Sequence, residues 1–305
     1  MKFQSVGFFF LFASLSVHNC TESPKQAATE ATPALQKPVA QADPGFATYW
    51  YAGTAELATY DVIQDRYGET RKAEQVSVFV TEDFSANKHV KLDDPMAAGA
   101  DRVPVLKLNW IRRFHTGIYD YSLMQSIFSP IDGSLALKTT TSIQDWCGQV
   151  FQQFDHQQDG YKLQSHSYFE SEGDQQTFLP DAILEDALWT MVRLNPASIP
   201  AGVQRLVPSA IYHRFQHIKE TVQSANLQII RQGDASVLQV QYSGIPRSLA
   251  IRFETNFPHK ILGWEETYAG KKISEGKLKS VRKEAYWQKN HNENEPLRDS
   301  LNLRF

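Results

Sequence analysis

The sequence predicts a mainly β protein in which an antiparallel meander forms a barrel or a strongly curved sheet. Three observations carry this prediction. Apolar residues alternate with polar ones along many short segments, turn residues separate these segments, and few helical patterns interrupt them. A period of two places one face of each strand in the core and leaves the other face in water.

The alternation is clearest in five segments, which are followed or preceded by turn residues. The segments are residues 76–80, 106–110, 238–242, 249–253 and 262–268. The turn signals are Tyr67-Gly68, Asp132-Gly133, Asp159-Gly160, Gly233-Asp234 and Ala269-Gly270. Strands that follow one another without helices between them predict consecutive hairpins.

The stretch QDWCGQVFQQF (residues 144–154) fits both a helix face and a strand. Gly148 disfavours the helix, and Asp159-Gly160 predicts a turn into YKLQSHSYFE. We therefore predict that the stretch is a strand and that the two segments form a hairpin.

One covering helix is predicted at about residues 181–195, in PDAILEDALWTMVRLNP. Asp181 can cap its first turn, and Asn195-Pro196 stops it. Its apolar stripe should pack on the sheet; the stripe contains Ile183, Leu184, Ala187, Leu188, Met191 and Val192. Weaker helical patterns occur in SAIYHRFQHIKETV and in residues 295–303.

The N-terminus predicts an exported chain. The apolar run from Val6 to Val17 is shorter than the ~20 residues that a membrane span needs, and it follows Lys2 and ends at a polar exit. Cys20 at this exit resembles the cysteine of a bacterial lipoprotein signal, although His18 and Asn19 replace its usual small residues. The alternative is a plain cleaved signal with an incidental cysteine.

The predicted organisation is a signal peptide at 1–19, a lipidated cysteine and disordered tether at 20–45, and a single β-rich domain at 46–305. The tether prediction rests on Thr21–Pro44, which has no aromatic residue and one leucine. Several acyl chains on Cys20 would anchor the chain firmly to a membrane. We expect a cell-envelope location, on the outer membrane and facing the periplasm.

Composition excludes some classes of function. Lys and Arg number 31 against 34 for Asp and Glu, a net charge of −3, which predicts no nucleic-acid partner. Cys147 is the only cysteine of the predicted domain, so that domain cannot form an internal disulfide.

Six separated blocks resemble a family of Bacteroidota lipoproteins of unknown function. The blocks are TYWYAGTAELATYDVIQDRYGETRKAEQVSVFVTEDFSANKHVKLDD, VPVLKLNWIRRFHTGIYDYS, TTTSIQDWCGQVF, SYFESEGD, ILGWEETY and AYWQKNHNENEPLRDSL. Members of this family often carry the label "septum formation inhibitor Maf". True Maf nucleotide pyrophosphatases open with a strand and a Ser-Pro-Arg-Arg phosphate-binding motif, which this chain lacks. The resemblance implies an exported lipoprotein and assigns no catalytic residue.

A metal site is one hypothesis. His213, His217 and Glu220 would share one face of a helix, and two imidazoles with a carboxylate can bind zinc. A zincin needs a glutamate after the first histidine, where this chain has Arg214. The alternative is an ordinary polar helix face.

A nucleophilic site is a second hypothesis. Cys147 would act with His115, His156 or His166 as base and Asp145 as orienting group, which requires a lowered thiol pKa. The alternative is a buried structural cysteine, which we favour because Trp146, Val150 and Phe151 are close in sequence. The sequence contains no motif that predicts a cofactor.

A binding site is the third hypothesis. A cluster of basic and aromatic residues could receive an anionic or glycan headgroup through charge and stacking; it contains Trp110, Arg112, Arg113, His115 and Tyr119. The alternative is that strand alternation sends Arg113 and His115 to solvent while Trp110 fills the core.

These observations favour a non-enzymatic envelope lipoprotein that binds a lipid or glycan ligand or an envelope partner protein. Its catalytic residues, if it has any, stay unknown. The alternative is a periplasmic hydrolase, with or without a metal, whose site the residue spacing does not disclose.

Overall fold

The structure is a computed structural model, and it describes residues 45–304. The predicted signal peptide at 1–19, the predicted lipidation of Cys20 and the predicted tether up to residue 44 lie outside the described residues. In the part of the chain that the structure describes, no helix is long and apolar enough to cross a membrane.

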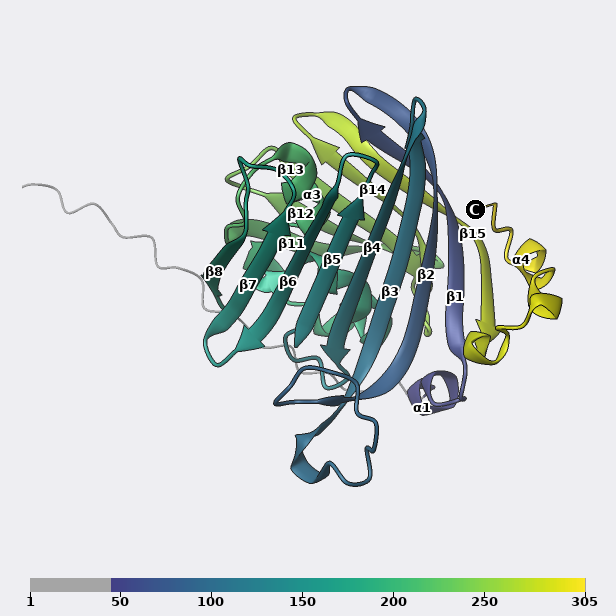
Figure 1. The fold of residues 1–305 in the computed structure, drawn as a ribbon. Helices are drawn as coiled ribbons and strands as arrows, with labels where there is room; N and C mark the ends of the chain where they lie inside the picture. The colour runs from purple at the N-terminus through teal and green to yellow at the C-terminus, as the bar shows by residue number, and fades with distance from the viewer. Residues whose placement is uncertain (1–44, 305) are drawn as a thin grey trace, which may run out of the picture. The chain divides into compact units, whose positions relative to one another are not determined.

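Fifteen strands form one curved sheet whose two end strands do not pair with each other (Figure 1). The first meander contains β1 (Ala55–Arg66), β2 (Glu69–Ser85), β3 (Arg102–Thr116), β4 (Tyr119–Pro130), β5 (Lys138–Gln144), β6 (Gln149–Gln157), β7 (Gly160–Ser167) and β8 (Gln175–Pro180). The second contains β9 (Ile183–Leu184), β10 (Gly202–Val207), β11 (Gln223–Gln232), β12 (Ala235–Tyr242), β13 (Arg247–Glu254), β14 (Ile261–Tyr268) and β15 (Lys271–Glu284). The predicted meander is therefore confirmed as a curved sheet.

β1 and β15, the first and last strands of the described residues, join the two meanders. β1 pairs antiparallel with β15, so that Gln64 lies opposite Ser274. This pairing brings together segments more than 200 residues apart, as Figure 1 shows. It also places the β1–β2 turn and the β14–β15 turn side by side, because β1 ends where β15 begins.

The helices within residues 45–304 are short. They are α1 (Phe46–Trp50), α2 (Leu188–Leu194), α3 (Ala210–Gln216) and α4 (Leu297–Ser300), with 3₁₀ turns at Gly99–Asp101, Glu185–Ala187, Pro196–Ser198, Tyr286–Gln288 and Asn292–Asn294. The helix predicted at about residues 295–303 is thus reduced to α4.

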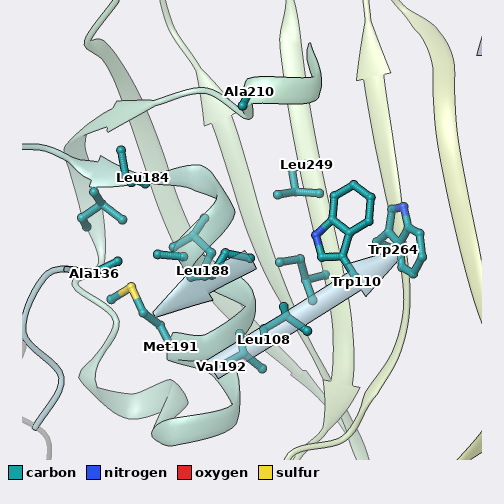
Figure 2. Close-up of a cluster of buried hydrophobic side chains, with 14 of the residues drawn as sticks. Leu108, Trp110, Ala136, Leu184, Leu188, Met191, Val192, Ala210, Leu249 and Trp264 are labelled. Atoms are coloured by element: carbon teal, nitrogen blue, oxygen red, sulfur yellow. The ribbon is translucent and has the colours of Figure 1, made fainter. Parts of the chain in front are cut away.

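The main core lies on the inner face of the sheet. Leu188 and Val192 of α2 lie near Leu108 of β3, and Trp110 of β3 lies beside Trp264 of β14 in the same cluster (Figure 2). The predicted packing of this helix on the sheet is confirmed.

The prediction that the covering helix spans about 181–195 is wrong at its start. Ile183 and Leu184 form β9, which pairs in parallel with Leu206 and Val207 of β10, and helical turns begin only at Glu185. A short run of buried apolar residues gives the same pattern in a strand and in a helix. The predicted stop at Asn195 is confirmed, and its side chain accepts a hydrogen bond from the Ala197 amide.

Two valines of β2 belong to a second, smaller core. Val78 and Val80 lie on the outer face with Leu57, where Leu301 of the C-terminal segment packs against them. Phe79 faces the main core instead. Both faces of β2 are apolar here, so alternation alone could not identify the inner one.

The hairpin predicted from residues 144–170 is confirmed as β6 paired with β7. The start of QDWCGQVFQQF differs, because Asp145–Gly148 form the turn between β5 and β6. The Asp145 carboxylate accepts hydrogen bonds from the amides of Cys147 and Gly148, which is the usual way in which aspartate stabilises a tight turn.

Candidate functional site

The basic and aromatic cluster predicted on β3 is divided between the two faces of the sheet. Trp110 and Arg112 are buried on the inner face, whereas Arg113 and His115 are exposed on the outer face. Tyr119 is half-buried at the start of β4. The five residues therefore do not form one surface, and strand alternation is the physical reason.

Arg112 is a buried cation held by neutral groups. Its side chain is 4% exposed. Nε donates to Oε1 of Gln75 at 3.0 Å, and Nη1 donates to Oε1 of Gln64 at 2.6 Å and to Oγ of Ser274 at 3.3 Å. Nη2 has no hydrogen-bond partner among the described residues.

Burial lowers the pKa of Arg112 to about 10, and the charge of Glu266 partly opposes this. The guanidinium is therefore still a cation at pH 7. No carboxylate of the described residues forms an ion pair with it. Removing a charged group from water costs several kcal/mol unless an opposite charge compensates it, so the strands hold an unneutralised charge in place.

Two tryptophans flank this guanidinium. The Arg112 carbon Cζ lies 5.1 Å from the ring centroid of Trp110 and 5.4 Å from that of Trp264. Nε1 of Trp264 donates to Ser274 at 3.0 Å. A Cβ atom on Gly276 would meet the Trp264 ring at 2.2–2.4 Å, so glycine is what allows the ring to lie here.

Arg66, at the end of β1, is a second buried cation with neutral partners. It donates to the Tyr121 hydroxyl at 3.4 Å, to the Phe215 carbonyl at 3.3 Å and to the Tyr67 hydroxyl at 3.4 Å. Its guanidinium carbon lies 4.3 Å from the Tyr67 ring centroid and 4.6 Å from that of Phe215. Like Arg112, it forms no ion pair with a carboxylate of the described residues.

Both arginines line one cavity of about 510 Å³, which we call the arginine pocket. The β1–β2 turn, β3, α3 and the β14–β15 turn bound it. Aromatic rings form much of its wall, from Tyr67, Tyr212, Phe215 and Tyr268. A volume of this size, with a wall that combines aromatic rings and polar side chains, occurs in small-molecule sites.

Cations outnumber free carboxylates on the wall of the pocket. Lys271 adds a third positive charge to the two arginines. Glu266 also lies on the wall, but it accepts a hydrogen bond from Arg247 at 3.0 Å. Asp65 is the remaining acidic residue of the wall.

Arg247 fixes this side of the pocket. It binds Glu185 with two nitrogens and Glu266 with one, and all three side chains come from different elements. Burial works against its charge, but Glu185 and Glu266 raise the pKa of Arg247 above its ordinary value. The two glutamates are therefore occupied by a structural ion pair.

The three predicted metal ligands line a different and smaller cavity of about 140 Å³. α3 ends at Gln216, His217 takes a left-handed conformation and Glu220 lies beyond the helix, so the predicted shared helix face does not form. Glu220 accepts a hydrogen bond from Gln152, and His217 pairs with Glu172 at 3.0 Å. Among residues 45–304 no cluster of three His, Cys, Asp or Glu side chains has an arrangement that could hold a metal ion.

His213 provides a test of pH dependence. Burial lowers its pKa to about 4, Arg247 adds to the effect, and the nearby backbone of Ile218 and Lys219 opposes it. The side chain is 2% exposed and neither nitrogen makes a well-formed hydrogen bond. Below about pH 6.5 the unfolded chain binds a proton that the folded chain does not, so stability falls as the pH falls towards 4.

We expect His213→Leu to reduce this acid sensitivity. The wild-type protein should lose about 2 kcal/mol of unfolding free energy at pH 5 relative to pH 8 through this histidine, and the variant should not. Urea unfolding of both proteins at the two pH values measures the difference. An identical pH dependence in the two proteins would contradict the burial of a neutral His213.

Cys147 is exposed in the β5–β6 turn, so the favoured prediction of a buried cysteine is wrong. Trp146 is 70% exposed, which removes the packing argument. The charge of Asp145 raises the pKa of the Cys147 thiol, the opposite of what a nucleophile needs. His156 and His166 pair with Asp181 and Asp174 instead.

His115, the third proposed base, pairs with Asp120 at 2.5 Å on the outer face. The structure therefore offers no base oriented towards Cys147 by a hydrogen bond in the described residues.

The sequence did not identify Arg66 and Tyr67 as candidate site residues. Their signal in the sequence was a basic and an aromatic residue immediately before Gly68.

No protein-family model matches the chain, and no curated protein is similar to it. Among solved structures it is similar to a crystal structure described as a β-barrel-like protein of the domain of unknown function DUF1849 from Brucella abortus. The TM-score is 0.49 and the identity 10%, over 75% of this chain and 98% of the other.

Proposed function

We propose that this chain is a non-enzymatic binding protein that holds a lipid- or glycan-type ligand in the arginine pocket. The observation that carries the proposal is the pocket itself, about 510 Å³ of space lined by four aromatic rings together with cationic and polar side chains. Aromatic rings bind both apolar chains and sugar faces by burying large areas of surface. A binding protein needs such a partly apolar cavity and needs no oriented nucleophile.

The proposal includes attachment to the cell envelope through a lipidated Cys20, with the body on the outer membrane facing the periplasm. The signal-like run before Cys20 and the tether composition after it support this location. A hydrolase stays the alternative. It is less well supported, because Arg247 engages Glu266, which leaves Asp65 as the single unpaired carboxylate of the described pocket wall. In addition, no base among the described residues is oriented towards the exposed thiol by a hydrogen bond.

A pocket-filling substitution tests the proposal. Gln216 ends α3 on the pocket wall, so Gln216→Trp should occupy part of the cavity. We expect it to weaken binding of the uncharged fluorophore N-phenylnaphthylamine at least ten-fold, as measured by fluorescence titration. Gln228→Trp on the exposed surface of β11 is the matched control and should bind as the wild type does. Equal binding by all three proteins would place the ligand elsewhere.

A further inference from the structure

We propose that the ligand of the arginine pocket carries an anionic group that binds the guanidinium of Arg112, a proposal that rests on the binding function argued above. The chemical class is an amphiphile with a carboxylate, sulfonate, sulfate or phosphate group beside an apolar or ring-containing body. Of the basic residues that the sequence suggested as an anion site on β3, only Arg112 faces the pocket. Arg113 and His115 face the opposite side of the sheet and do not belong to this site.

The hydrogen bonds of Arg112 leave one donor group unused. Nε and Nη1 are engaged by Gln75, Gln64 and Ser274, which come from three different strands. Nη2 has no such partner in the part of the chain that the structure describes, and the side chain lines the cavity. Three neutral acceptors therefore fix the orientation of the guanidinium without neutralising its charge.

This arrangement differs from that of the other deeply buried arginines. Arg193 binds Glu56 with two nitrogens, and Arg247 binds Glu185 and Glu266. Arg193 and Arg247 do not line the arginine pocket, and carboxylates of the chain neutralise the charge of both. Arg112 lines the cavity and lacks such a carboxylate, so a ligand would supply the missing anion.

The remaining charges of the pocket suit an anion of one or two negative charges. Arg66 and Lys271 lie on the same wall, and Arg66 is held between the rings of Tyr67 and Phe215. The carboxylate of Asp65 on this wall would repel a ligand with more negative charges than that. The rings beside these cations would receive the uncharged part of the ligand.

A matched pair of probes tests the inference on the full chain. Anilinonaphthalene sulfonate and N-phenylnaphthylamine share one ring skeleton, and only the first carries a negative charge. We expect the wild-type protein to bind the sulfonate at least ten-fold more tightly. Arg112→Gln should remove this preference by weakening sulfonate binding roughly ten- to a hundred-fold, with little change for the neutral probe.

Arg113→Gln is the control, because it removes the same charge from the neighbouring exposed position and should bind both probes as the wild type does. If Arg112→Gln does not fold, as judged by circular dichroism, the preference of the wild-type protein decides alone. Equal affinity of the wild type for both probes would overturn the anionic ligand and leave the binding function standing. Failure of the wild type to bind either probe would contradict the binding function itself.

Discussion

Replacing Arg193 by alanine should destabilise the protein by about 3–5 kcal/mol, because it leaves a buried carboxylate without its partner. Arg193 is fully buried and binds both oxygens of Glu56, with Nη2 at 2.7 Å from Oε2. Its Nε also donates to the carbonyl of Pro258 at 2.9 Å. The pair thus joins α2 to β1 and to the β13–β14 loop.

Burial works against the negative charge of Glu56, but Arg193 holds the pKa of this carboxyl below its usual value. The pair is therefore ionised, and urea unfolding at pH 7 should show the full loss in Arg193→Ala. The double variant Arg193→Met, Glu56→Leu should recover much of it, since no charge is then buried alone. Arg113→Ala on the outer face should change stability by less than about 0.5 kcal/mol. A single variant as stable as the wild type would contradict the ion pair.

The second large effect is expected for Trp264→Ala, which should cost about 3–5 kcal/mol of unfolding free energy. The ring is 4% exposed and packs edge-on against Tyr60 and Trp189, with centroids at 5.1 and 5.3 Å. Its removal opens a cavity beside Gly276, and the remaining side chains cannot fill it without moving strands of a continuous sheet.

Trp146→Ala is the control for this prediction, because Trp146 is 70% exposed in the β5–β6 turn and should contribute less than about 0.5 kcal/mol. Thermal and urea unfolding compare the three proteins. Trp264→Ala should also make the Arg112 side chain less well ordered. The Trp264 ring centroid lies 5.4 Å from the guanidinium carbon, and Nε1 of Trp264 donates a hydrogen bond to Ser274, which accepts one from Arg112. Similar stability losses for both tryptophans would contradict the assigned core.

The strands could be predicted because their pattern is local. Residues 106–110 alternate in the sequence as they do in β3, and dipeptides such as Gly233-Asp234 form the turns that their chemistry predicts. β9 could not be predicted, because two buried residues that pair in parallel leave no period to detect. The exposure of Cys147 could not be predicted from its apolar sequence neighbours, because residues 145–148 form a turn and turns lie at the surface.

The pocket could be predicted only in part. Arg112 stood out in the sequence, but its face was not determined until β3 was placed in the sheet. Arg66 and Lys271 are more than 200 residues apart, and the β1–β15 pairing brings their segments together. No local sequence pattern predicts such a long-range pairing. A site whose residues come from both paired strands therefore cannot be recognised in one segment of the sequence.

The most direct test of an anionic ligand in the arginine pocket is a crystal structure of the protein with anilinonaphthalene sulfonate. We expect density for the rings among Tyr67, Phe215 and Tyr268, with the sulfonate within hydrogen-bond distance of Nη2 of Arg112. Density for the probe on the outer face beside Arg113, with the arginine pocket empty, would contradict it.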